Sequence, residues 1–173
     1  MSRAFTKEDD LEHAGIDIPE RPVSQEKNYV TPAGLKELKV SLDNLDKNRK
    51  SLIENEAYKN DQKILRIERD IRYFSSRIKS AILIDPIIQD KELILFSAKV
   101  SVLSIYNKKY QFEIVGEDEA NIKEYKISYL SPLAKLLLGC RVNDEVVWNK
   151  PSGNEKLTIT DIYYCGQTNP NHF

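Results

Sequence analysis

The chain has 173 residues, of which 31% are charged, and its formal net charge is −1. This length fits one ordinary domain, or a helical rod joined to a small domain, and the balanced charge gives no overall sign of a nucleic-acid binder. No apolar run approaches the ~20 residues that a membrane helix needs, and the N-terminal residues lack the apolar segment of a secretory signal. We therefore expect a cytoplasmic protein with no membrane partner.

The first 28 residues are polar and acidic. They include the run Glu8-Asp9-Asp10 and the prolines Pro19 and Pro22. This composition predicts an extended or disordered arm over residues 1–28, because such a segment has little apolar surface to bury. A segment that lies along the rest of the chain, or along a partner, is the alternative interpretation.

Residues 29–84 have the spacing of a helical hairpin. Apolar side chains recur in steps of three and four in two sets: Leu35, Leu38, Leu42, Leu45 and Leu52, then Ile64, Ile67, Ile71, Phe74, Ile78 and Ala81. Arg49 interrupts the first set. These are the narrow seams of a coiled coil, and two seams joined by a short polar stretch bury each other when the helices pack antiparallel. Helices of about 22 residues would form a rod of roughly 33 Å.

Local signals predict the ends of these two helices. Thr31 is a suitable N-cap and is followed by a proline, so the first helix is expected to run from there to about Leu52. The second helix is expected to run to about Ile82 and to stop before Asp85-Pro86, because the residue before a proline avoids the helical region. The centre of the hairpin then falls near Glu56.

From residue 93 onward the pattern becomes that of a small β-sheet. Alternating apolar residues and polar turns predict strands over 96–105, 110–115, 125–130, 142–149 and 156–164. After the third strand, Ser131 and Pro132 are a typical helix start and Gly139 is a typical helix end. Residues 85–165 are therefore expected to form a mostly antiparallel sheet with one short helix, followed by a tail over 166–173.

Four phrases in the sequence carry a family resemblance. They are YVTPAGL at 29–35, RYF at 72–74, FEIVGEDEA at 112–120 and ISYLSPLAKLLLG at 127–139. With them the chain resembles, over about residues 29–165, the GreA/GreB transcript-cleavage and elongation factors of bacterial RNA polymerase, most closely their GreB-like branch. The resemblance implies an α+β fold: an N-terminal antiparallel α-helical coiled-coil hairpin and a C-terminal FKBP-like antiparallel β domain with one short helix.

The resemblance also implies a partner and a mechanism. In Gre-like factors the C-terminal domain docks at the rim of the polymerase secondary channel, and acidic residues at the tip of the coiled coil help to hold a second Mg²⁺ in the polymerase active site. The chain is then no enzyme itself, binds no cofactor when isolated, and depends on the Mg²⁺ of the polymerase if cleavage is supported. Cys140 and Cys165 have no metal-type spacing and are expected to be reduced thiols, so no intrinsic metal site is predicted.

The tip departs from the family motif, Asp-x-x-Glu-Asn-x-x-Tyr. The corresponding run is SLIENEAY at 51–58, so Ser51 stands at the aspartate position. The first helix is also shorter than in full-length Gre factors by about two heptads, which shortens the rod by about 10 Å when it is shared between both arms. The candidate catalytic helpers are Glu54, Glu56 and Asp61, and a solvated polar turn is the alternative interpretation.

Two further sets of residues are candidate contact sites. The basic side chains near the tip that could contact RNA or the channel wall are Arg49, Lys50, Lys63 and Arg66. A solvated face of alternating charge is the alternative interpretation of this set. The residues that align with the polymerase-contacting segment of the family are Leu130, Ser131 and Pro132. They also fit a plain helix start.

We therefore expect an elongated monomer that binds bacterial RNA polymerase, contacts the nascent RNA 3′ end and stimulates transcript cleavage weakly or not at all. A non-cleaving secondary-channel regulator similar to Rnk, which competes with cleavage-active Gre factors, is the alternative within the same architecture. An intrinsic nuclease is disfavoured because no cluster of spaced carboxylates and histidines occurs outside the tip. A generic coiled-coil adaptor would not explain the C-terminal phrases.

Overall fold

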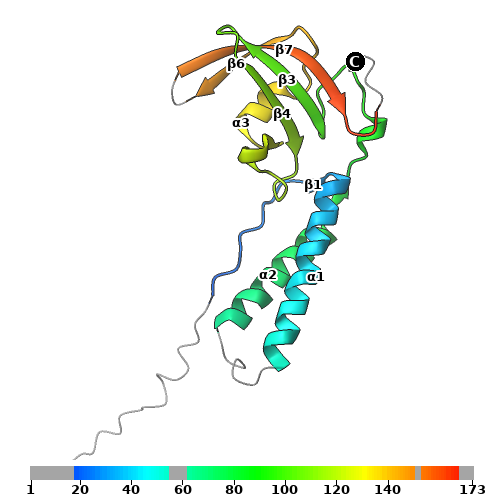
Figure 1. Cartoon of the computed structure of the whole chain (residues 1–173), viewed down its shortest axis with the longest axis vertical. Coiled ribbons are helices and arrows are strands. Elements are labelled where there is room, and N and C mark those ends of the chain that lie inside the picture. Colours follow the sequence, from blue (N-terminus) through cyan, green and yellow to red (C-terminus); the bar gives the residue numbers. More distant parts are fainter. Residues whose placement is uncertain (1–17, 55–61, 151–152, 168–173) are drawn as a thin grey trace, which may run out of the picture.

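A computed structural model shows a two-part molecule, in which a pair of helices leads through a short 3-10 turn, η3 (Pro86–Ile88), into a curled β-sheet (Figure 1). It describes residues 18–54, 62–150 and 153–167. The predicted α+β class, with an N-terminal helical hairpin and a C-terminal β domain that contains one short helix, is confirmed. Within the described residues no helix is both long and apolar enough to pass through a lipid bilayer.

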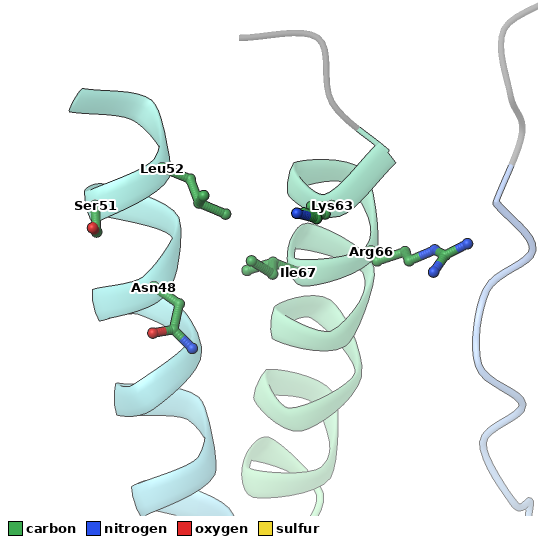
Figure 2. Close-up of a pocket in the computed structure, with 6 residues that line it drawn as sticks. All are labelled: Asn48, Ser51, Leu52, Lys63, Arg66 and Ile67. Carbon is green, nitrogen blue, oxygen red and sulfur yellow. The ribbon is translucent and has the colours of Figure 1, made fainter. Parts of the chain in front are cut away.

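Two helices form the rod: α1, Pro32–Glu54, and α2, Gln62–Lys79. Every residue of the two predicted seams is buried or half-buried. Figure 2 shows one such contact, in which Leu52 of α1 and Ile67 of α2 point toward each other. The large aliphatic side chains of these helices that lie outside the seams are exposed, namely Val40, Ile53 and Leu65. This narrow buried stripe is typical of a coiled coil, so the predicted hairpin is confirmed.

One helix end differs from the prediction. α2 stops at Lys79 rather than at about Ile82, and the chain then forms a short strand, β2, Ile82–Leu83. This strand pairs in parallel with β1, Tyr29–Val30, directly before α1. The Ile82 N–H donates to the Asn28 carbonyl at 2.8 Å. The backbone after α2 is therefore satisfied by the segment that precedes α1, and this pairing replaces a further turn of helix.

The C-terminal sheet has five strands in the order β5-β4-β3-β7-β6. Their bounds are Ala98–Ser104 for β3, Lys109–Val115 for β4, Lys126–Ser128 for β5, Glu145–Lys150 for β6 and Gly153–Tyr164 for β7. Neighbouring strands are antiparallel except β4 and β5, which are parallel. In this detail the sheet is mixed rather than antiparallel, because the loop after β4 and the 3-10 turn η4 (Ile122–Glu124) carry the chain back before β5 begins.

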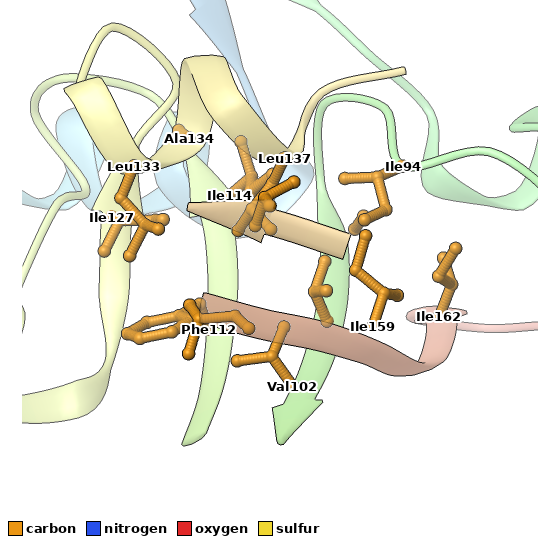
Figure 3. Packing of buried hydrophobic residues seen from close by; sticks show 14 of the residues in the cluster. Ile94, Val102, Phe112, Ile114, Ile127, Leu133, Ala134, Leu137, Ile159 and Ile162 are labelled. Carbon is orange, nitrogen blue, oxygen red and sulfur yellow. The ribbon is translucent and has the colours of Figure 1, made fainter. Parts of the chain in front are cut away.

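The core of the β domain lies between the sheet and the short helix α3, Pro132–Leu137. Figure 3 shows Leu133 and Leu137 of this helix facing Ile114 and Ile159 of the strands. At one end of the core, Trp148 packs edge-on against Phe112, with ring centroids 5.8 Å apart. The half-buried Trp148 thus packs against the edge of this core.

The segment before β1 runs beside α2 (Figure 1). Glu20 forms an ion pair with Arg72. The Arg21 guanidinium carbon lies 3.8 Å from the centre of the Tyr73 ring. The described part of the predicted arm, residues 18–28, thus lies along the rod, which was the alternative interpretation of its sequence, while residues 1–17 lie outside the described residues.

Candidate functional site

The end of the rod that lies away from the sheet holds the first predicted site. Glu54 is the last residue of α1, and its side chain is exposed. Glu56 and Asp61, the other candidate catalytic residues, lie outside the described residues. An exposed carboxylate at the end of a rod is accessible to an external cation, as a metal helper must be. Of the three predicted carboxylates, the structure therefore places one.

A groove of about 420 Å³ opens between the two helices close to this end (Figure 2). Its lining residues are Asn48, Ser51 and Leu52 of α1, and Lys63, Arg66 and Ile67 of α2. Ser51, at the aspartate position of the tip motif, contributes a hydroxyl and no charge. The groove combines apolar side chains with amide, hydroxyl and ammonium groups, and the guanidinium of Arg66 extends from α2 on the side away from α1 (Figure 2). This lining is suited to an anionic ligand.

The structure brings together two of the four basic residues predicted near the tip. Lys63 and Arg66 line the groove, whereas Arg49 and Lys50 are not among its lining residues. Arg49 is half-buried in the seam, and its Nη2 lies 3.2 Å from the Asp46 carboxylate of the same helix. Its side chain is 34% exposed and its charged end has a partner on the same helix, which explains how a cation fits a seam position.

The predicted polymerase-contacting segment lies at the start of α3. Ser131 Oγ accepts a hydrogen bond from the Ala134 N–H at 3.2 Å and so caps the helix. Pro132 is exposed and Leu130 is half-buried. The helix start is confirmed, and contact with polymerase stays a prediction. The cap makes this corner of the β domain rigid as well as accessible.

The joint between rod and sheet contains charged residues that the sequence patterns did not indicate. Arg77 of α2 is 2% exposed, and its Nε donates to Asp118 Oδ2 at 2.6 Å, with Glu117 Oε2 lying 3.4 Å from Nη2. The Tyr73 hydroxyl donates to Asp118 Oδ1 at 2.5 Å. Burial, together with this hydrogen bond, raises the pKa of Tyr73 to about 12. Asp118 therefore ties two successive turns of α2 to the loop that follows β4.

The next residue of this loop ties α1 to the sheet. The Thr31 hydroxyl donates to Glu119 Oε2 at 2.6 Å, and the Lys126 ammonium lies 3.7 Å from Oε1. The Glu119 side chain is 3% exposed, and burial raises the pKa of its carboxyl. This approach requires a glycine at position 34, because a Cβ on Gly34 would lie 2.4 Å from Glu119 Oε2. The acidic loop, defined as residues 117–119, thus holds both helices.

Comparison with known proteins gives matches in sequence. Residues 89–164 match the family described as "Transcription elongation factor, GreA/GreB, C-term". The chain is 34% identical over 157 residues to transcription elongation factor GreB of Neisseria meningitidis serogroup B, an alignment that covers 82% of this chain and 96% of that relative. It is 32% identical over 152 residues to transcription elongation factor GreA of Francisella philomiragia, covering 78% of this chain and 95% of the relative.

Solved structures also align with the chain. The elongation factor GreA/GreB from Nitrosomonas europaea is 21% identical, with a TM-score of 0.41, and the alignment covers 80% of this chain and 100% of that one. GreA factor homolog 1 of Thermus thermophilus is 20% identical, with a TM-score of 0.39, covering 80% and 99%. Because both TM-scores are below 0.5, the sequence relatives alone carry the comparison.

Proposed function

The chain belongs to the GreA/GreB family of transcription elongation factors, and from this premise we propose that it binds bacterial RNA polymerase as a GreB-like cytoplasmic monomer and regulates elongation through the secondary channel. In this proposal the β domain docks at the channel rim and the rod enters the channel. The observation that supports it is the joint, where the buried ion pair between Arg77 and Asp118 fixes the direction of the rod relative to the dock. A factor that delivers a tip into a channel needs such a rigid joint.

The start of α3 is the docking point in this proposal. Pro132 is exposed, and the cap at Ser131 holds the local backbone, so binding at this corner costs little conformational entropy. Leu130 adds apolar side-chain area beside the exposed proline. A small, rigid corner with apolar and backbone groups is suited to docking against a protein surface.

Gel filtration with bacterial core RNA polymerase tests this docking point. We expect the full chain to co-elute with polymerase, and we expect Leu130→Lys to weaken binding about tenfold or more, as loss of a central interface contact does. Leu136→Lys is the matched control, because it adds the same charge at a leucine of α3 that is 38% exposed. Failure of the full chain to bind contradicts the proposal, and equal binding by the two variants places the dock elsewhere.

For the tip, we propose that the chain stimulates transcript cleavage weakly or not at all. Mg²⁺ favours carboxylate and water oxygens, and Ser51 offers neither an anionic oxygen nor the reach of a longer side chain. Glu54 is exposed at the end of α1, so one carboxylate is available there. Any cleavage is assigned to the polymerase active site, and the isolated chain is expected to leave RNA intact. The serine also favours a second candidate function, a non-cleaving regulator similar to Rnk that competes with cleavage-active factors.

Backtracked elongation complexes, analysed by RNA gels, test the proposal for the tip. We expect little cleavage with the unchanged chain and inhibition of a cleavage-active Gre factor added with it. Ser51→Asp and Ser51→Asn, the uncharged control of similar size, separate the two causes: more cleavage with the aspartate assigns the defect to the missing anionic ligand, and equal cleavage assigns it to the rod, which is about 10 Å shorter than in full-length Gre factors. Robust cleavage by the unchanged chain that disappears in Glu54→Ala would refute the proposal.

The groove near the tip is our proposed contact for the nascent RNA 3′ end. Lys63 supplies positive charge there and Arg66 supplies it on the adjoining face of α2, and phosphate contacts of this kind dominate the affinity of proteins for nucleic acids. Crosslinking from a photoreactive RNA 3′ end in a backtracked complex should therefore map to the groove, and it should decrease in Arg66→Ala. A crosslink confined to the β domain contradicts this assignment.

A further inference from the structure

The helix α2 is basic, whereas the rest of the chain carries a net negative charge. Within Gln62–Lys79 there are six Lys or Arg residues and two acidic residues, so the helix carries a net charge of +4 while the chain carries −1. Arg77 is used at the joint, and Arg69 pairs with the adjacent Asp70. Arg66 and Arg72 extend from the helix nearer the tip, and both are exposed. A helix with this charge is an electrostatic site for a polyanion.

The arm, here meaning residues 18–28, covers part of this helix. Arg72 donates through both Nε and Nη2 to Glu20 Oε1, with the Nε bond at 3.0 Å. Arg21 stacks over the Tyr73 ring at 3.8 Å, and its Nη1 lies 3.7 Å from the Asp70 carboxylate. One acidic residue of the arm therefore occupies the guanidinium fork of Arg72, which matches a phosphate as well as it matches a carboxylate.

The two ends of the arm are held with different strength. Near the joint, Asn28 is 4% exposed and its Nδ2 donates to the Arg77 carbonyl at 2.7 Å. Farther out, the side chains of Glu20 and Arg72 are 60% and 57% exposed. Exposed ion pairs of this kind change an equilibrium constant by about fivefold or less. The arm can therefore lift from α2 at its outer end while its inner end stays in place.

We propose that the arm is a releasable strap on the basic face of α2, and that single-stranded RNA competes with Glu20 for Arg72. Release would extend the cationic surface from the groove at Arg66 along the helix toward the joint. In sequence, residues 1–28 contain seven acidic residues and four Lys or Arg residues, so the N-terminal part of the chain has the sign of charge of a competitor for a polyanion. The choice of RNA as the polyanion rests on the proposed function.

Fluorescence anisotropy with a labelled single-stranded RNA oligonucleotide tests the strap. Glu20→Lys in the full chain should bind RNA about three- to tenfold more tightly than the unchanged chain, because the competitor is lost and the arm is repelled from Arg72. Glu26→Lys is the matched control, since it makes the same charge change in the arm at a residue whose backbone N–H, rather than its side chain, donates to the Ser24 hydroxyl. Adding Arg72→Ala to Glu20→Lys should remove the gain.

Equal RNA affinity of Glu20→Lys and Glu26→Lys overturns the inference, as does the absence of RNA binding by every variant. A second readout is cleavage after Glu20 by a glutamyl endopeptidase, identified by mass spectrometry. RNA should accelerate this cleavage severalfold. If RNA binds and the rate of cleavage after Glu20 does not change, the inference is also overturned. Co-elution with polymerase is measured separately, so failure of the strap and failure of the proposed function are distinguishable.

Discussion

Removing the acceptor of the buried ion pair at the joint should destabilise the rod more than any surface charge does. Arg77 is 2% exposed and its Nε lies 2.6 Å from Asp118 Oδ2. In Asp118→Ala the guanidinium stays buried and keeps only Glu117, at 3.4 Å. Breaking a buried pair by removing one partner costs about 3–5 kcal/mol. Because the Glu117 contact remains, we expect a loss near the lower end, about 3 kcal/mol in the free energy of unfolding.

The assay is urea unfolding followed by two probes. Far-UV circular dichroism reports mainly on α1 and α2, and the fluorescence of Trp148, the single tryptophan, reports on the sheet. With a slope of about 1–3 kcal/mol per molar urea, a loss of about 3 kcal/mol lowers the midpoint by about 1–3 M. The helical signal should shift at least as far as the tryptophan signal, because the pair ties α2 to the loop.

A matched control separates burial from charge. Glu92→Ala removes the exposed pair between Glu92 and Arg141, whose charged atoms lie 2.9 Å apart, and should cost less than about 1 kcal/mol. Asp118→Asn keeps an acceptor for the Tyr73 hydroxyl and should fall between the two. If Asp118→Ala costs no more than Glu92→Ala, the buried pair does not hold the joint and the reasoning is wrong.

Three further predictions concern the same joint. Burial raises the folded-state pKa of the Glu119 carboxyl, so the unchanged chain loses stability as the pH rises from 4.5 through that pKa. In Glu119→Gln the melting temperature should therefore fall less over this pH range. Parallel pH profiles of the variant and the unchanged chain would contradict this. Gly116→Ala should cost about 1–3 kcal/mol in urea unfolding, because its Cβ would lie 2.6 Å from the Tyr29 carbonyl oxygen; an unchanged midpoint would show that β1 can move away. In absorbance titrations against Tyr73→Phe, the tyrosine that ionises at about pH 12 should shift toward pH 10 in Asp118→Ala, and an unshifted titration would contradict the assigned hydrogen bond.

The rod could be predicted from sequence because the spacing of its apolar residues corresponds directly to the positions that are buried between the helices. Seam positions are buried or half-buried, and Val40 and Leu65 between them are exposed. The parallel pairs escaped prediction for a physical reason. β1 has two residues, too few to show an alternation, and the alternation that predicts β5 does not say beside which strand, or in which direction, it pairs.

The structural role of the acidic loop could not be predicted from the residues around it in the sequence. Three successive acidic residues after a strand have the composition of a solvated turn, and they become structural only because Arg77, about 40 residues earlier, is brought to them. The useful signals were an arginine in the helix beside the seam and a glycine, Gly34, in the first turn of a helix. The arginine can be interpreted only once its partner Asp118 is known, and the glycine only once its neighbour Glu119 is known.

Three acidic residues, two of them paired with Arg77 and the third with Thr31 and Lys126, restrict the rod in a way that an apolar joint would not. Apolar contacts are non-directional, so an apolar joint of the same area would tolerate small rotations of the rod relative to the β domain. Here a rotation separates a buried charge from its partner, and the cost of doing so is about 3–5 kcal/mol. The length of the rod makes this restriction matter: over roughly 33 Å, a tilt of about 10° moves the tip by about 6 Å, which is far more than the ~2.1 Å contact that Mg²⁺ requires. The same tilt would misplace a groove meant for RNA, so the joint is required whether or not the tip supports cleavage.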